Sequence, residues 1–202
     1  MDARCIRHTT FAFVDVETTG IDAATARVVE VAYQIVRGGA VTATFESLID
    51  PQCGIPPFAT AIHGITDAHV HGKPTLAEVA PALVTDCDGA IVVAHNAAFD
   101  RRFLTPLAQR RWMCSWRLAA RVVPEAPNHK NHTLGAFFGV RDPLLRGRRA
   151  HRALCDVVVT RHVFFHCIER YLGAGYGDCI EDLATFLERP RSECLAYGRK
   201  TA

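Results

Sequence analysis

The feature that most constrains this fold is an apolar run that ends in two acids, Thr10–Glu17. The run is rich in β-branched and aromatic residues, which is typical of a strand buried on both faces. Val28–Arg37 and Val41–Ile49 have the composition of two further strands, joined by a tight Gly38-Gly39 turn. We therefore expect the chain to begin with a meander of antiparallel hairpins.

After an expected loop at 51–57, which is rich in Pro and Gly, helical and strand patterns alternate. Thr75 and Glu78 are spaced as a capping box at the start of a helix predicted over Thr75–Cys87. The later predictions are a strand at Ala90–Ala94, a helix at Ala97–Arg110, a strand at Trp112–Ser115, and helices at Trp116–Val123 and Ala153–Leu172. This order predicts an α/β domain with a mixed β-sheet flanked by α-helices.

Composition excludes several classes of protein. The chain has 202 residues, of which 49% are hydrophobic, and this is the size of one globular domain. Its apolar runs fall short of the roughly 20 residues that a bilayer span needs, and Met1 to Thr10 lacks the apolar centre of a signal peptide. The 8 cysteines have no zinc-knuckle spacing. We expect reduced, mainly structural thiols in a cytoplasmic protein, although an even count is also compatible with disulfide pairs.

The strongest chemical signal is Asp15-Val16-Glu17 at the end of the first predicted strand. Because side chains alternate along a strand, both carboxylates point to the same face. The carboxyl ends of strands are where open α/β sheets place their sites. A D-x-E pattern alone is more often a solvated strand end, so the prediction depends on further acids.

Two later segments supply those acids. Asn96 is suited to cap a helix that would carry Asp100 in its first turns, close to the end of the preceding strand. His151 and Asp156 lie five positions apart, and in one continuous helix they would face about 140° away from each other. Both can serve one site only if His151 precedes the helix and Asp156 lies inside it. Taken singly, Asp100 and Asp156 also fit a helix-dipole partner and an exposed acid.

Together these segments resemble the DnaQ-like 3′–5′ exonucleases of the DEDDh type. Asp15 with Glu17 matches the family's first motif, Asp100 the second, and His151 with Asp156 the third. The resemblance continues in an I-H-G-I-T segment at 62–66, in H-N-A-A-F-D at 95–100 and in W-M-C-S at 112–115, where the family has W-x-C-T. The segment 61–74 and the pair Arg101-Arg102 are most similar to the exonuclease X type.

The resemblance implies a ribonuclease H-like fold, with an exonuclease domain over 1–172 and a C-terminal extension over 173–202 packed on it. It also implies two Mg²⁺ or Mn²⁺ ions held by Asp15, Glu17, Asp100 and Asp156. Four clustered carboxylates repel one another without cations, and ligation by oxygen alone favours these ions over zinc. Such ions can orient an attacking water and stabilise the leaving 3′ oxygen. His151 would be the general base, since histidine titrates near neutral pH.

Contacts with substrate are weaker predictions. The N–H groups of Thr18, Thr19 and Gly20 would meet the terminal nucleotide, while Asn96 and Phe99 would touch its sugar or base and His63 would lie near the base. The alternatives are structural roles: a turn for the three residues at 18–20, a helix cap for Asn96, a core aromatic for Phe99 and a loop histidine for His63. We expect only structural roles for the other histidines, namely His69, His71, His129, His132, His162 and His166.

Charge is divided unevenly along the chain. Residues 1–100 carry 5 Lys or Arg and 12 Asp or Glu, whereas 101–152 carries 12 Lys or Arg and only two acids. This basic segment favours contact with a phosphate backbone, most of all at Arg101, Arg102 and Arg149. A solvated face in an arginine-rich protein is the alternative.

The expected partner is therefore a nucleic acid 3′ end, with DNA favoured over RNA in a repair or turnover role. Three alternatives stay open: a ribonuclease T-like enzyme on RNA ends, a proofreading or binding subunit that acts mainly by association, and a homodimer of either enzyme. A nucleotide-binding oxidoreductase is excluded, because no G-x-G-x-x-G or P-loop follows the first strand.

Overall fold

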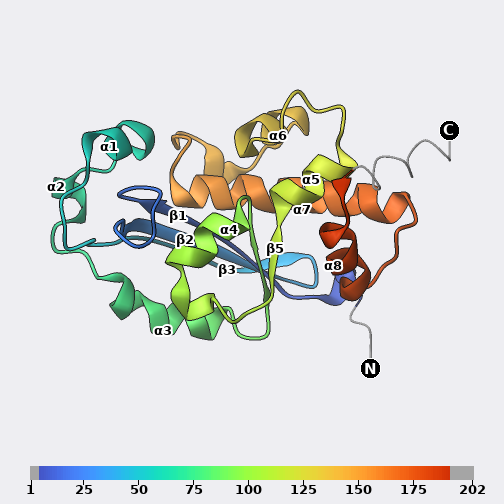
Figure 1. Cartoon of the computed structure of the whole chain (residues 1–202), viewed down its shortest axis with the longest axis horizontal. Helices are drawn as coiled ribbons and strands as arrows, with labels where there is room; N and C mark the ends of the chain where they lie inside the picture. The colour runs from blue at the N-terminus through green and yellow to red at the C-terminus, as the bar shows by residue number, and fades with distance from the viewer. Residues whose placement is uncertain (1–4, 192–202) are drawn as a thin grey trace.

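A five-stranded mixed sheet forms the centre of the protein (Figure 1). In this computed structural model, which describes residues 5–191, the strand order is β3-β2-β1-β4-β5. The first three strands form the expected antiparallel meander, while β4 and β5 run parallel to β1. Their bounds lie within one residue of those predicted: β1 (Phe11–Thr18), β2 (Val28–Arg37), β3 (Ala40–Leu48), β4 (Ile91–Ala94) and β5 (Trp112–Cys114).

Helices cover both faces of the sheet. The long helix α7 (Ala153–Gly173) crosses one face, and α3 (Leu76–Asp86) and α4 (Ala97–Phe103) lie on the other (Figure 1). The remaining elements are α1 (Pro57–His63), α2 (Asp67–Val70), α5 (Ser115–Val122), α6 (Asn131–Phe137), α8 (Ile180–Glu188) and the 3₁₀ turns η1 (Ile6–His8), η2 (Thr105–Leu107) and η3 (Pro143–Leu145).

Strand β1 is buried on both faces, as its composition predicts. Phe11 and Phe13 pack into the core beneath α7, whereas Ala12 and Val14 pack into the core on the α3 side. Asp15 follows the alternation of Phe11 and Phe13, so it points toward the face that α7 covers. The fold therefore sets the predicted acids of β1 on the same side of the sheet as the helix that carries Asp156.

The structure corrects the sequence prediction at two prolines. The segment expected to be a loop contains α1, because Pro57 occupies the first turn of a helix, where its missing N–H costs nothing. The helix expected over Ala97–Arg110 ends at Phe103 instead. Pro106 disfavours helical geometry at the residue before it, and the chain continues into η2. Helices α2, α6 and α8 were not predicted.

The described part of the C-terminal segment packs on the same core as α7. Ile180, Leu183 and Phe186 of α8 belong to that core, and the Ile6 N–H donates to the Asp178 carbonyl at 2.8 Å. Residues 192–202 of the predicted extension lie outside the described residues, as does Cys194. The seven described cysteines are free thiols, in agreement with the sequence prediction. No helix between residues 5 and 191 combines the length and the apolar character that crossing a bilayer requires.

Candidate active site

The carboxyl end of β1 brings Asp15 and Glu17 to one side of the sheet. In the antiparallel ladder with β2, Asp15 lies opposite Ala32 and Glu17 opposite Glu30, and the register shifts just after Glu17. One carboxylate oxygen each from Asp15, Glu17 and Asp156 lie within 4.8 Å of one another. The first and third sequence motifs therefore meet in space, although they lie at opposite ends of the domain in the sequence.

Asp100 reaches the same cluster from α4. Its side chain is only 3% exposed, and the main-chain N–H groups of Asp100 and Val16 donate to its carboxylate. Asn96 takes the N-cap position before α4, as predicted, but its side chain makes no capping hydrogen bond. The predicted N-cap position is therefore confirmed, but the predicted capping hydrogen bond is not formed. The Asn96 amide stays available for another role.

Asp156 lies in the first turn of α7 and is held from α6. The His132 Nε2 donates to the Asp156 carboxylate, and the Asn131 side-chain amide donates to the Asp156 carbonyl at 3.0 Å. His132, for which only a structural role was predicted, therefore contacts a member of the acidic cluster. No local motif marks His132, because its contact depends on how α6 packs on α7.

His151 precedes α7, as the five-residue spacing to Asp156 requires. Its backbone φ is 58°, in the left-handed region, which histidine adopts more readily than most residues. The exposed ring lies edge-on to His132, with the two centroids 5.8 Å apart. Since His132 contacts Asp156, His151 stands at the rim of the acidic cluster rather than inside the helix.

A fifth carboxylate, Glu30, fastens the start of α7 to the sheet. Glu30 is fully buried and accepts hydrogen bonds from Arg152 Nε at 3.0 Å and from the Ala153 N–H at 2.8 Å. This bond satisfies one of the free N–H groups of the helix terminus. Sequence analysis missed Glu30, although a glutamate inside an otherwise apolar strand is a usable signal for a buried partner.

Mutual repulsion and burial dominate the electrostatics of the cluster. Burial and then Asp156 and Asp100 raise the pKa of Asp15 well above its ordinary value. Burial is also the main cause that raises the pKa of Glu17 to about 8 and that of Asp100 to about 7. The hydrogen bond to Asp156 raises the pKa of His132. These shifts are those of a cluster whose charge is not compensated by the protein.

The donor set fits divalent cations that prefer oxygen. Asp15, Glu17 and Asp156 offer clustered carboxylate oxygens, and Asp100 is close enough to raise the pKa of Asp15. Two divalent ions would neutralise four such carboxylates, and hard ions such as Mg²⁺ and Mn²⁺ take oxygen ligands of this kind. A cation therefore relieves the repulsion that raises these pKa values.

The structure limits which predicted groups can meet a substrate near Thr18. The Thr19 N–H donates to the Arg27 carbonyl at 2.8 Å, so it is not free for a nucleotide, and this corrects the prediction for that group. The Thr18 hydroxyl donates to the Gly20 carbonyl at 2.6 Å. His63 is 2% exposed, and its Nδ1 accepts from the Ile65 N–H at 3.0 Å. Contact between His63 and a base would require α1 to move.

Basic side chains border the cluster, but several are already paired. Arg148 binds Glu46 at 2.7 Å, as Arg152 binds Glu30, and Arg101 donates to the Ala108 carbonyl at 2.9 Å. Arg102 lies 5.8 Å from the centre of the Phe99 ring.

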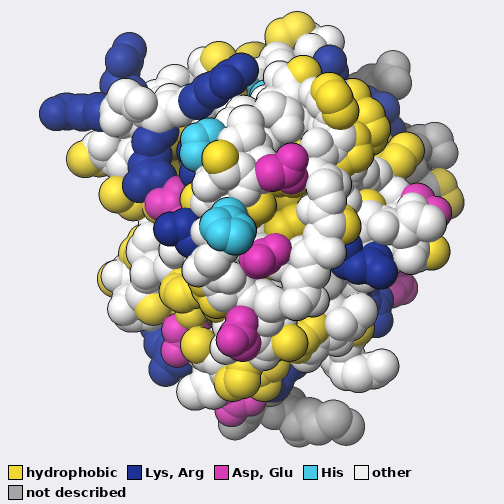
Figure 2. Space-filling view, turned by 90° about the vertical axis from the view of Figure 1, so that its left-hand side faces the viewer, with side chains coloured by type: hydrophobic (Ala, Val, Ile, Leu, Met, Phe, Trp, Pro, Cys, Tyr) yellow, Lys and Arg dark blue, Asp and Glu magenta, His cyan; other side chains and the backbone are white. Residues whose placement is uncertain are grey.

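Arg149 lies over Gly64, so close that a Cβ there would be 2.9 Å from its Nη1. Figure 2 looks onto the end of the molecule that carries α1, with acidic and histidine side chains in its middle and Lys or Arg above and beside them. Arg102 and Arg149 thus remain as exposed cations that form no ion pair with a described residue.

His95, the first residue of the H-N-A-A-F-D segment, has a structural place. Its Nδ1 and the Ser115 hydroxyl are 2.9 Å apart, and its Nε2 donates to the His129 carbonyl at 2.8 Å. Burial lowers its pKa to about 4, so the ring is neutral. His95 therefore links the end of β4 to the segment that leads into α6 and His132.

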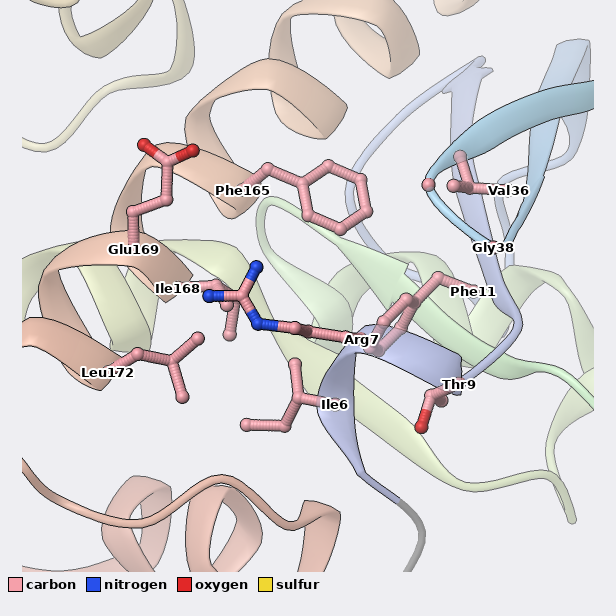
Figure 3. A pocket seen from close by; sticks show the side chains of 11 residues that line it. Ile6, Arg7, Thr9, Phe11, Val36, Gly38, Phe165, Ile168, Glu169 and Leu172 are labelled. Atoms are coloured by element: carbon pink, nitrogen blue, oxygen red, sulfur yellow. The ribbon is translucent and has the colours of Figure 1, made fainter.

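A separate cavity of about 270 Å³ lies at the other end of β1 (Figure 3). Arg7, Phe11 and Gly38 border it from η1, β1 and the β2–β3 turn, and Phe165 and Leu172 border it from α7. Its lining is mostly apolar and shares no residue with the acidic cluster.

A family model described as Exonuclease (RNase_T) matches residues 12–164. The chain belongs to this exonuclease family. It is 37% identical over 185 residues to a protein of Mycobacterium tuberculosis that is named as a bifunctional exonuclease/endonuclease, covering 84% of this chain and 28% of that protein. It is 29% identical to the PolC-type DNA polymerase III of Caldanaerobacter subterraneus, covering 89% of this chain but 13% of the polymerase.

Two further proteins match over most of their own length. The DNA polymerase III subunit epsilon of Aquifex aeolicus is 29% identical over 178 residues, which is 84% of this chain and 86% of the subunit. The structure of exonuclease X in complex with 5′ overhanging duplex DNA superimposes with a TM-score of 0.70 at 30% identity, covering 88% of this chain and 99% of that one. The DnaQ-like resemblance and the ribonuclease H-like fold are therefore confirmed.

Proposed function

We propose that this exonuclease domain removes nucleotides from DNA 3′ ends with two divalent cations, Mg²⁺ or Mn²⁺. The observation that carries the proposal is the convergence of Asp15, Glu17, Asp100 and Asp156 from three separate elements into one cluster, in which the pKa values of Asp15, Glu17 and Asp100 are raised. A cluster of this charge has no structural use of its own, since repulsion destabilises it. Binding of cations supplies the missing compensation.

Each residue of the cluster then has a chemical role. The four carboxylates would hold the two ions, which when bound supply the electrophilic stabilisation for in-line phosphodiester hydrolysis. A ring nitrogen of His151 would accept the proton of the attacking water, because the exposed ring at the rim can approach a phosphate from the solvent side. His132 would orient the Asp156 carboxylate, and Glu30 would hold the first turn of α7.

The proposal of a DNA substrate rests on exposed arginines and on the similarity to exonuclease X. Arg102 lies against the Phe99 ring and Arg149 over Gly64, and both are exposed, so they would contact the phosphate backbone. Arg101 would contribute through the guanidinium nitrogens that do not bind the Ala108 carbonyl. Thr18, Gly20, Asn96 and Phe99 remain proposed contacts of the terminal nucleotide. The similarity to exonuclease X, whose structure contains duplex DNA, favours DNA over RNA.

The decisive experiment uses matched DNA and RNA oligonucleotides, single- and double-stranded, labelled at the 3′ or the 5′ end. With Mg²⁺, we expect immediate release of the 3′ label as a mononucleotide and a stepwise ladder from the 5′-labelled strand. EDTA should stop both. Absence of metal-dependent release from any 3′ end would overturn the proposal, while faster release from RNA would replace DNA by RNA as the substrate.

A second candidate function is proofreading within a polymerase. The similarities to subunit epsilon and to PolC-type polymerases favour it, since these proteins are named as parts of DNA polymerase III. Co-purification with a polymerase of the same cell, and faster removal of a mismatched than of a matched 3′ nucleotide, would support this role. Light scattering at several concentrations distinguishes that association from a homodimer, the alternative left open by the sequence.

A further inference from the structure

A second group of possible metal ligands lies against the acidic cluster. One ligand atom each from His132, Cys155 and Asp156 lie within 4.8 Å of one another. Two of these residues are neighbours in the first turn of α7, and the third comes from α6. The three side chains thus bring a nitrogen, a sulfur and an oxygen to one place.

Cys155 is the residue that makes this group unusual. Its side chain is only 5% exposed, and its thiol forms no hydrogen bond with a described residue. The other two members are already directed toward each other, since His132 Nε2 donates to the Asp156 carboxylate. An unpartnered buried thiol therefore faces an imidazole and a carboxylate that the fold has already oriented.

This donor set favours a different ion from the one the acidic cluster favours. Sulfur and imidazole nitrogen are ligands that zinc prefers, whereas Mg²⁺ and Mn²⁺ prefer oxygen alone. Tetrahedral zinc, with ligands at about 2.0–2.3 Å, sets its ligand atoms about 3.3–3.8 Å apart. The three ligand atoms lie within 4.8 Å of one another, a limit only about 1 Å above that spacing.

We propose that His132, Cys155 and Asp156 form an inhibitory zinc site that takes Asp156 away from the catalytic ions. The thiol proton is released to solvent when sulfur binds the zinc as thiolate. A water completes the fourth position, since the His132 side chain is 35% exposed and opens the group to solvent. The binding part stands on these three residues alone, and the inhibition part rests on the proposed nuclease function.

The two metals would compete for one carboxylate. Asp156 belongs both to this group and to the group formed with Asp15 and Glu17. Zinc bound through Asp156, His132 and Cys155 removes one ligand from the acidic cluster and also occupies the imidazole that orients Asp156. Zinc would therefore stop hydrolysis in excess Mg²⁺ without displacing the ions held by Asp15.

Binding is tested first, with Co²⁺ as a spectroscopic substitute for zinc in the metal-free protein. We expect a thiolate-to-cobalt charge-transfer band in the near ultraviolet that zinc abolishes by competition. Cys155→Ala should lack the band, whereas Cys167→Ala should keep it, since that variant removes a buried thiol farther along the same helix. Absence of the band in the unaltered protein, or its survival in Cys155→Ala, would overturn the site.

Inhibition is tested next, by titrating zinc into the 3′-end assay at excess Mg²⁺. Cys155→Ala should match the unaltered protein without zinc and need at least about tenfold more zinc for half inhibition, because one of three ligands is lost. Cys167→Ala should be inhibited like the unaltered protein. Equal sensitivity of all three would overturn the inhibition. If no chain shows nuclease activity, the proposed function fails, while the cobalt spectra still decide the zinc site.

Discussion

The two halves of the acidic cluster are held in place by different means. Asp15 and Glu17, the sheet half, sit on a strand that is paired with β2 on one side and β4 on the other. Asp156 and His151, the helix half, depend on side-chain bonds from Glu30, Asn131 and His132 to the first turn of α7. Main-chain pairing of β1 persists after a side chain is replaced, whereas each bond to α7 is lost when the side chain of Glu30, Asn131 or His132 is replaced. Substitution within the sheet half should therefore leave the fold intact, while substitution of the side chains that hold the helix half should not.

The largest effect is expected from Asp15→Asn in the sheet half. Loss of an essential group should lower the rate of nucleotide release by about 10³-fold or more. The fold should survive, and without metal the thermal midpoint should rise, because one source of repulsion with Asp156 and Glu17 is gone. Steady-state kinetics and melting curves in EDTA measure both effects. Asp22→Asn is the control, an exposed acid outside the cluster.

Glu30→Ala should affect the helix half through stability as well as rate. It leaves Arg152 and the Ala153 N–H without their buried partner, which should cost about 3 kcal/mol in the free energy of unfolding. Displacement of the first turn of α7 should lower activity by about 10- to 100-fold. Urea denaturation and the 3′-end assay test this. A variant as stable and active as the unaltered protein would show that the helix half does not need Glu30.

The pH dependence of stability separates the cluster from the rest of the fold. In metal-free protein, the pKa of Glu17 is raised to about 8, that of Asp100 to about 7 and that of Asp15 well above normal. The unfolded chain loses these protons near pH 4. The folded state therefore holds more protons across this window, so stability must fall as pH rises.

We expect the melting temperature in EDTA to be lower at about pH 8 than at about pH 6.5, a range above the ordinary histidine pKa. The raised pKa of His132 acts in the same direction. Mg²⁺ should restore the loss, and Asp15→Asn should reduce it. A higher melting temperature at the alkaline end in EDTA would contradict the raised pKa values.

The smallest effect is expected from Thr75→Ala, far from both halves. Thr75 and Glu78 form the predicted capping box of α3, with the Thr75 N–H donating to Glu78 at 2.7 Å. Removing the cap should cost about 1 kcal/mol of stability. Nuclease activity should not change, since no residue of α3 belongs to the acidic cluster. A loss of activity in this variant would contradict the prediction and would show that activity depends on the overall stability of the fold.

Local patterns in the sequence were enough to predict the strands, whereas the motif acids were singled out only by their combination and by the family resemblance. The composition of Phe11–Thr18 depends on neighbours in sequence, as does the capping box of α3. The position of His151 before α7 followed from helix periodicity. These predictions succeeded because strand alternation and helix geometry act over a few residues.

Contacts between distant elements could not be predicted. His132 was expected to be structural, and its bond to Asp156 depends on the packing of α6 on α7. Glu30 binds the main chain at Ala153, a sequence separation of 123 residues, and no pattern of neighbours encodes that pairing. The course of α1 was missed for a local reason, because Pro57 was taken as a helix breaker when it begins the helix.

The bond between Glu30 and the start of α7 has a consequence during synthesis. The Ala153 N–H, which donates to the Glu30 carboxylate, belongs to a part of the chain that is synthesised 123 residues after Glu30. A growing chain carries Asp15, Glu17 and Asp100 long before it carries Asp156, so the proposed site for cations would stay incomplete until the start of α7 has been made. On that proposal, the nuclease would become active only after the chain has been synthesised through α7 and has closed on itself.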